Sequence, residues 1–184
     1  QVKACAAFCN LLLEVHPAKM FCIEQCLGAL VDFTQSVDRR LVCHAAWCFK
    51  NLTDKLPTDC RFQVLNAFNW RHVKPLINHT DPSVQHSTLR FIQNVCSSDP
   101  ESIQRVIEWS HGELLNVISD KLSRIDDCRP DVVTAALTVV SNVATGTPQH
   151  QDAVVASRVP SLLVGCLKDR RDGAIRCAAA FCVI

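Results

Sequence analysis

The sequence predicts an all-α protein built from a repeated unit of three helices. The apolar positions are filled mainly by Ala, Leu, Val and Cys, whereas Gly occurs 5 times and Tyr is absent. This composition favours helix over sheet. An asparagine also follows a similar apolar run four times, at spacings of 41, 43 and 48 residues; these asparagines are Asn10, Asn51, Asn94 and Asn142.

Signals for the start of a helix keep a fixed distance from these asparagines. Asp38 and Asp81 each lie thirteen residues before an asparagine, and Asp is a good N-cap. Pro82 and Pro130 each lie twelve residues before one, where proline is favoured as the first helical residue. The register therefore predicts long helices that end near the asparagines. The apolar residue after an asparagine is expected in the core, namely Leu52, Val95 and Val143.

The blocks between these long helices each read as the end of a short helix, a tight break and an amphipathic helix. The unit is thus a short, a medium and a long helix over about 42 residues, which is the period of three-helix armadillo repeats. We predict a right-handed armadillo (ARM/HEAT-like) superhelical solenoid whose long helices line its concave side. A globular helical bundle is the alternative.

The predicted organisation follows from this register. Residues 1–16 are the end of a repeat, 17–56, 57–99 and 100–146 are full repeats, and 147–184 are a truncated repeat. We interpret residues 123–131, which hold the surplus of the 48-residue interval, as a longer surface loop. We expect the fragment to be incomplete at both ends, because each end lies inside a predicted helix.

Composition argues against several function classes. Charged residues are 20% and the formal net charge is +1, so nothing in the whole chain favours nucleic acid or an acidic membrane surface. No apolar run reaches the ~20 residues that span a bilayer. Paired carboxylates, a phosphate loop and a nucleophile elbow are all absent, so we expect no catalytic residues. The basic stretch 168–176 is interpreted as a solvated loop, and Trp70 and Trp109 as packing or surface residues.

The twelve cysteines are interpreted as small hydrophobic residues in a reducing compartment. No CxxC, HxxxH or HExxH is present, so we expect neither a metal site nor a cofactor. Seven of the cysteines lie inside Ala, Leu and Val runs: Cys5, Cys9, Cys43, Cys48, Cys166, Cys177 and Cys182.

The stretch "HAAWCFKNLTD" places Trp47 one helical turn before Asn51. An asparagine amide carries both donors and an acceptor, which suit the N–H and C=O groups of an extended peptide. One asparagine per repeat would form a ladder along the groove, and Trp47 would form the wall of a side-chain pocket. Alternatively, Trp47 packs inside and Asn51 only ties neighbouring loops. The candidate groove residues are His44, Trp47, Asn51, Arg90 and Asn94, with Asn10, Thr138 and Asn142.

Five stretches carry a resemblance to a known family: "CNLLLEVHPAK", "ALVDFTQSVDRRLVCHAAWCFKNL", "LINHTDPSVQHSTLRFIQNV", "ALTVVSNVATGTPQHQDAVV" and "AAAFCVI". In order and loop length they resemble the C-terminal part of the armadillo repeat-containing protein 8 family, the armadillo subunits of the CTLH (GID) E3 ubiquitin ligase complex. The resemblance covers nearly all 184 residues.

The resemblance implies a non-catalytic scaffold in the cytoplasm and nucleus. In that family the superhelix docks an exchangeable substrate receptor by gripping the receptor's C-terminal tail in its groove, so that substrates are degraded by the proteasome. Trp47 and Asn51 carry over by motif, together with Arg90 and Asn94. Asp54 departs from the pattern, because an apolar or aromatic groove residue is expected at its position.

Two other protein-binding classes remain as alternatives. A nuclear import receptor of the importin-α type needs successive Trp-x-x-x-Asn rungs flanked by carboxylates. Here one of the four rungs has Trp, and Arg90 would repel a basic ligand. A catenin-like signalling or adhesion scaffold would need a groove lined by Lys and Arg along its length.

Overall fold

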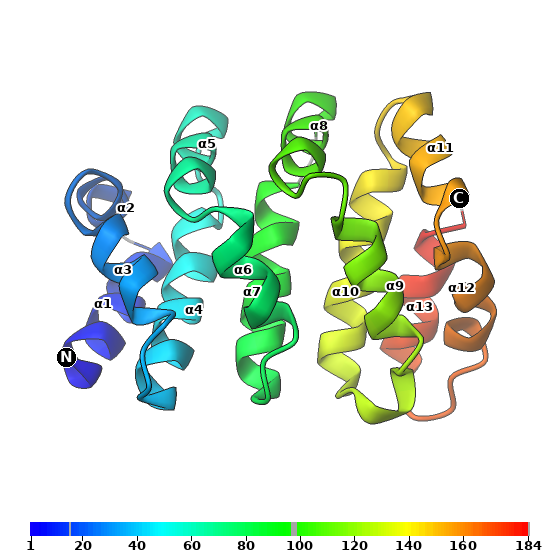
Figure 1. Ribbon diagram of the computed structural model, residues 1–184, viewed down its shortest axis with the longest axis horizontal. Coiled ribbons are helices and arrows are strands. Elements are labelled where there is room, and N and C mark those ends of the chain that lie inside the picture. Colours follow the sequence, from blue (N-terminus) through cyan, green and yellow to red (C-terminus); the bar gives the residue numbers. More distant parts are fainter. Residues whose placement is uncertain (15, 97–98, 184) are drawn as a thin grey trace. The chain divides into compact units, whose positions relative to one another are not determined.

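The computed structural model describes residues 1–14, 16–96 and 99–183, and over these residues it consists of helices and their connections (Figure 1). The chain divides into two compact units, Gln1–Val95 and Cys96–Ile184.

In the first unit the long helices pack side by side. α4 lies between α1 and α7, while α3 packs against α4 and α6 against α7 (Figure 1). The elements of this unit are α1 (Val2–Glu14), α2 (His16–Phe21), the π-helical turn η1 (Cys22–Cys26), α3 (Leu27–Phe33), α4 (Arg39–Thr53), α5 (Thr58–Ala67), α6 (Trp70–Ile77) and α7 (Pro82–Val95).

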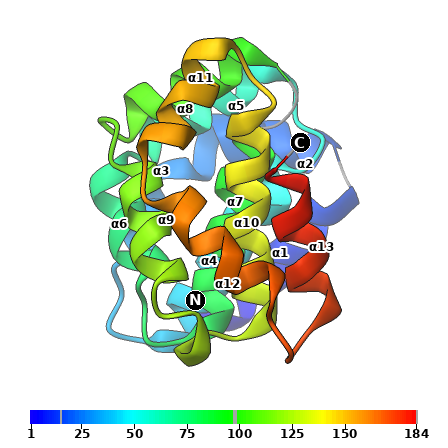
Figure 2. The same cartoon turned by 90° about the vertical axis from the view of Figure 1, so that its right-hand side faces the viewer.

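The second unit repeats this arrangement. α10 packs along α13 and α9 along α12, as Figure 2 shows. Its elements are α8 (Pro100–Trp109), α9 (Leu114–Leu122), the 3-10 turn η2 (Ile125–Asp127), α10 (Pro130–Ala144), α11 (Pro148–Ala156), α12 (Val159–Leu167) and α13 (Gly173–Phe181).

The third helix of a triplet is the long one, as predicted, with 15 residues in α4, 14 in α7 and 15 in α10. The predicted difference between a short first helix and a medium second helix is wrong in the repeats 57–99 and 100–146. α5 has 10 residues and α6 has 8, while α8 has 10 and α9 has 9. The first helices are longer than expected because they begin directly after Pro57 and at Pro100, and proline starts a helix readily.

The predicted helix starts are confirmed. Asp38 Oδ1 accepts a hydrogen bond from the Arg40 amide at 3.0 Å, and Asp81 Oδ1 accepts one from the Ser83 amide at 2.8 Å. Each carboxylate satisfies an N–H group that has no partner inside the helix. Pro82 and Pro130 are the first residues of α7 and α10, also as predicted.

The core lies where the asparagine register places it. In the first unit the rings of Phe49 and Phe68 stack with centroids 3.9 Å apart, and Phe91 approaches Phe49 edge-on at 5.9 Å. The apolar residues that come directly after an asparagine of the register were predicted to lie in the core, and they are fully buried: Leu52, Val95 and Val143.

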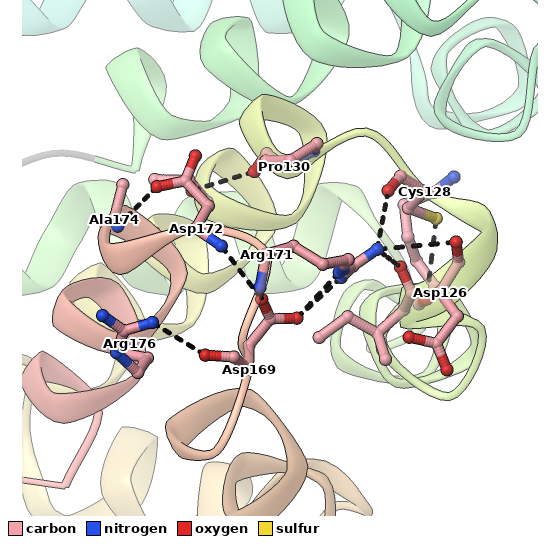
Figure 3. Close-up of polar contacts among 11 residues, drawn as sticks. Asp126, Cys128, Pro130, Asp169, Arg171, Asp172, Ala174 and Arg176 are labelled. Atoms are coloured by element: carbon pink, nitrogen blue, oxygen red, sulfur yellow. Dashed lines mark hydrogen bonds and ion pairs between the residues drawn. The ribbon is translucent and has the colours of Figure 1, made fainter.

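The loop between α12 and α13 is built around a buried carboxylate, Asp169 (Figure 3). The prediction of a solvated loop at 168–176 therefore holds only in part, because Lys168, Arg170 and Arg171 are exposed whereas α13 begins at Gly173. Asp169 accepts hydrogen bonds from Nη2 and Nε of Arg171 at 2.8 and 3.0 Å. This guanidinium holds the pKa of Asp169 below its usual value. The Nη1 atom of Arg171 donates to three backbone carbonyls in and after η2, those of Ile125, Asp126 and Cys128.

The same contacts change the interpretation of residues 123–131. This segment is not only a surface loop, since it contains η2 and its carbonyls are bound by Arg171. Arg171 lies two residues after Asp169, so its guanidinium can fold back onto that carboxylate. Its Nη1 group still points away and reaches the carbonyl of Ile125, 46 residues earlier in the chain.

The prediction that cysteines fill the core holds for several of them. Cys5, Cys9, Cys48 and Cys166 are buried. Cys177 is exposed and contradicts the prediction. It lies two residues after the buried Ile175, and a rotation of about 200° over two residues places it on the opposite face of α13. Cys43 and Cys182 are half-buried.

Candidate functional site: a cleft along the long helices of the first unit

An open cleft of about 330 Å³ lies along α1, α4 and α7. It contains three of the predicted groove residues, Asn51, Arg90 and Asn94. The complete lining comes from the three helices and the residue after α4: Leu13, Lys50, Asn51, Asp54, His86, Arg90 and Asn94. The asparagine register therefore leads to a real concave feature in this unit.

The amide of Asn51 ties α4 to α1. Its Nδ2 donates to the backbone carbonyl of Cys9 at 3.0 Å and lies 3.3 Å from Cys9 Sγ. A carbonyl can only accept, so the NH₂ group must be the half that faces it. Over the described residues these are the bonds that Asn51 makes with its side chain, and its Oδ1 is left as the atom that a ligand can use.

Asn94 makes the equivalent bond one repeat later. Its Nδ2 donates to the backbone carbonyl of Lys50 at 2.9 Å. In both cases the acceptor is the residue immediately before the preceding asparagine of the register. The alternative stated above, that Asn51 only ties neighbouring loops, is thus partly met: the Nδ2 group of Asn51 forms a structural bond, although this bond joins two helices. The proposed ligand contact is restricted to the acceptor half.

Trp47 lies one turn before Asn51 and is 39% exposed. Its indole is therefore not a core side chain. The His44 ring packs edge-on against it, with centroids 5.6 Å apart and planes at 84°. His44 itself is half-buried and its Nδ1 is buried without a hydrogen-bond partner among the described residues. Together the two rings present an apolar surface on the same helix as Asn51.

The cleft carries charges of both signs. Lys50 and Arg90 contribute positive charge, and the exposed Asp54 contributes negative charge. Arg90 Nη1 donates to Gln93 Oε1 at 2.8 Å, which holds the guanidinium along α7. A ligand with a carboxylate is therefore attracted by Arg90 and Lys50, whereas Asp54 favours a donor group at the end of α4.

Lys19 contacts Asp54, a residue of the cleft lining, and the sequence did not predict this contact. Its side chain is 6% exposed, and its Nζ donates to the backbone carbonyl of Asp54, the residue that ends α4. A cation at the C-terminal end of a helix satisfies a carbonyl that lacks a helical partner. Burial lowers the pKa of Lys19, and the nearby Asp54 carboxylate opposes that shift. No sequence pattern pairs these residues, because they are 35 positions apart.

The other predicted residues lie outside this cleft lining, and these include Trp47 and His44 on α4. Asn10 is exposed on α1. Thr138 and Asn142 belong to α10 of the second unit, where the Thr138 hydroxyl donates to the Thr134 carbonyl at 2.8 Å. The ladder across all four asparagines therefore stays a prediction.

Comparison with solved structures identifies the fold. A designed armadillo repeat protein in complex with the peptide (KR)4 matches 98% of this chain and 73% of its own, with a TM-score of 0.85 and 19% sequence identity. Computationally designed armadillo repeat proteins for modular peptide recognition match the same shares with a TM-score of 0.84 and 18% identity. The chain has the armadillo-repeat fold. The predicted fold class is confirmed, and the helical bundle is excluded.

Sequence comparison supports the predicted resemblance. Armadillo repeat-containing protein 8 from mouse (Mus musculus) is 24% identical over 147 residues, which are 79% of this chain and 21% of the mouse protein. The zebrafish (Danio rerio) protein of the same name is 26% identical over the same shares. No protein-family model matches the sequence. The chain is similar to these armadillo proteins over less of its length than predicted, and the match spans about a fifth of theirs.

Two further properties bear on the predicted partners. Across residues 1–14, 16–96 and 99–183, none of the helices has the length and apolarity needed to cross a membrane. The same residues contain no group of three or more His, Cys, Asp or Glu side chains that could hold a metal ion.

Proposed function

We propose that this armadillo chain is a non-catalytic scaffold that binds an extended segment of a partner protein. The observation that carries the proposal is the exposed Trp47, which lies on α4 one helical turn before Asn51, a residue of the cleft that also holds Arg90 and Asn94. The fold supports it, because two of the structural neighbours are described as armadillo proteins that bind or recognise peptides.

Each residue has a distinct role in this proposal. Trp47, with His44 against it, is the apolar anchor. Asn51 Oδ1 accepts a backbone N–H of the bound segment, because its Nδ2 is already bonded to Cys9. Arg90 pairs with a carboxylate of the ligand, with Lys50 as a second cation. Asn10, Thr138 and Asn142 would extend the contact along neighbouring repeats.

We further propose that the parent protein is the armadillo adaptor of a CTLH/GID-type E3 ubiquitin ligase in the cytoplasm and nucleus. The similarity to armadillo repeat-containing protein 8 supports this assignment. The bound segment would be the C-terminal tail of the substrate receptor, and docking would lead to proteasomal degradation of substrates. The other partners would be ligase subunits, not nucleic acid.

A titration with two labelled peptides tests both levels of the proposal. The first peptide is the C-terminal tail of a CTLH substrate receptor, and the second is a lysine-rich nuclear-import peptide. We expect the chain to bind the tail, and Trp47→Ala to weaken that binding by about 2 kcal/mol, or roughly 30-fold. Arg90→Ala should also weaken it, and the loss should shrink at high salt.

The control is Val164→Ala, an exposed apolar residue on α12 outside the cleft, which should bind the tail like the wild type. Binding of the lysine-rich peptide alone would place the chain with import receptors. Binding of neither peptide would refute the ligase assignment. Equal tail binding by Trp47→Ala and the wild type would remove Trp47 as the anchor, and equal binding by Arg90→Ala as well would remove the cleft as the site.

A further inference from the structure

Two thiols face each other where α1 packs against α4. The Sγ atoms of Cys5 and Cys48 are 3.9 Å apart, and Cys48 Sγ is 3.7 Å from the Cys5 carbonyl oxygen. Cys5 is 4% exposed and Cys48 is fully buried. A disulfide needs a sulfur–sulfur distance of about 2 Å, so each sulfur has to move by roughly 1 Å. Side-chain rotation with a slight shift of the two helices provides that movement.

Small molecules can reach one of these thiols. Cys5 borders an open, apolar pocket of about 370 Å³ whose other walls come from α1, α2, η1 and α3 and include Phe8, Phe21 and Phe33. Cys48 is not part of this lining and has no exposed surface. A reagent that enters the pocket therefore meets Cys5, and Cys48 lies directly behind it.

The two thiols also differ in acidity. The hydrogen bond from Cys48 lowers the pKa of Cys5, although burial opposes the shift. The contact with Cys5, the neighbouring Cys9 thiol and burial together raise the pKa of Cys48. A thiolate, not a thiol, is the nucleophile, so Cys5 is the thiol that attacks and Cys48 remains protonated.

We propose that Cys5 and Cys48 are a peroxide-sensitive dithiol that oxidises to a disulfide joining α1 to α4. Cys5 sulfur attacks one oxygen of a hydroperoxide; an S–O bond forms, the O–O bond breaks, and the other oxygen leaves as an alcohol or water. The Cys48 sulfur then attacks the sulfenic acid of Cys5. The S–S bond forms, and the hydroxyl leaves as water with the Cys48 proton. The two thiols lose two electrons, and the hydroperoxide gains them.

The cross-link would act on the helix pair that supports the candidate cleft. Cys48 follows Trp47 directly in α4, and Cys9, one turn after Cys5 on α1, accepts the hydrogen bond from Asn51. A disulfide between Cys5 and Cys48 would therefore fix the position of α1 against α4 close to Trp47 and to the bond between Asn51 and Cys9. The chemistry itself does not depend on what the cleft binds. In a reducing compartment the dithiol would be oxidised only transiently.

Disulfide mapping of the full chain tests the proposal. The native protein is treated with hydrogen peroxide, free thiols are alkylated after unfolding, and the digest is analysed by mass spectrometry without reduction. We expect a linked peptide pair containing Cys5 and Cys48, with the loss of two hydrogens, that dithiothreitol reverses. The urea midpoint of the oxidised protein should rise and return to its original value on reduction.

Three variants separate the roles. Cys48→Ser should leave Cys5 as a sulfenic acid that dimedone traps, and Cys5→Ser should leave Cys48 unoxidised. Cys26→Ser is the matched control, because Cys26 borders the same pocket, and it should form the disulfide like the wild type. Should the serine variants fail to fold, the wild-type mapping decides alone. The proposal is overturned if Cys5 pairs with another cysteine, or if both thiols stay reduced while the exposed Cys177 is oxidised.

Discussion

Replacing Asn51 by aspartate is the sharpest test of how the asparagine register works. The two side chains have nearly the same shape, but the substitution turns the NH₂ group into an oxygen. That oxygen would face the Cys9 carbonyl, which the Asn51 Nδ2 contacts at 3.0 Å, in a site that is 5% exposed. Two acceptors would then meet without a proton between them, and a charged carboxylate would take the place of a neutral amide at a buried position.

The magnitude follows from these contacts. Asn51→Ala loses a hydrogen bond with a net contribution of about 1 kcal/mol and leaves a small cavity that costs about 1 kcal/mol more. The Cys9 carbonyl keeps its bond within α1, so the full penalty of an unpaired group does not apply. Asn51→Asp adds the burial of a charge, and we expect about 3 kcal/mol or more at neutral pH.

Urea unfolding of the full chain, followed by circular dichroism and tryptophan fluorescence, measures both values. The matched control is Asn10→Asp, the exposed residue in the same register on α1, which should change the free energy of unfolding by less than about 0.5 kcal/mol. An Asn51→Asp variant as stable as the wild type, or more stable than Asn51→Ala, would show that the amide is not a donor to Cys9.

Three further results are expected. Leu52→Ala, at a fully buried position, should lower the free energy of unfolding by about 2–5 kcal/mol in the same urea titration, and a loss below about 1 kcal/mol would contradict its core position. Trp47→Ala should lower it by clearly less, because the indole is 39% exposed; unfolding of that variant would place Trp47 in the core and remove it from the proposed binding surface. Because Arg171 lowers the pKa of Asp169, the carboxylate stabilises the fold above its ordinary pKa of about 4, and the stabilisation is lost as the pH falls below it. Asp169→Asn should therefore be less stable than the wild type at pH 7 and equal to it at low pH in thermal scans; a gap that persists at low pH would contradict the role of the charge.

The elements that sequence predicts well here are those fixed by local chemistry. An aspartate that caps a helix contacts an amide two residues away, as Asp38 does, so the signal lies within a few positions of the helix it starts. The burial of Leu52 and Val95 follows from periodicity along one helix face. These features located the long helices and their core faces.

The polar contacts that complete the site depend on residues far apart in the sequence. Lys19 reaches the end of α4 across 35 positions, and Arg171 reaches η2 across 46. Nothing near either residue in the chain indicates its partner. The same limit explains the cysteines, since periodicity cannot show that Cys5 and Cys48 meet from neighbouring helices.

The orientation of the Asn51 amide group was also not predicted. The register places an amide at the right position, but it does not show which half of the amide is used inside the protein. The structure assigns the donor half to Cys9, and the same assignment recurs between Asn94 and Lys50. A recurring bond of this kind is a structural reason for the register, independent of any ligand.

That bond also explains where the spacing between repeats can vary. Each acceptor lies immediately before the preceding asparagine, so an insertion within a long helix would move the donor away from its carbonyl. Extra residues fit more readily in the connections, and the 48-residue interval has its surplus at 123–131, which comprises the connection between α9 and α10 and the first two residues of α10. There the exposed carbonyls of a longer connection need donors, and Arg171 supplies them. Replacing Arg171 by methionine should therefore increase hydrogen exchange at residues 123–131 and leave exchange in the first unit unchanged.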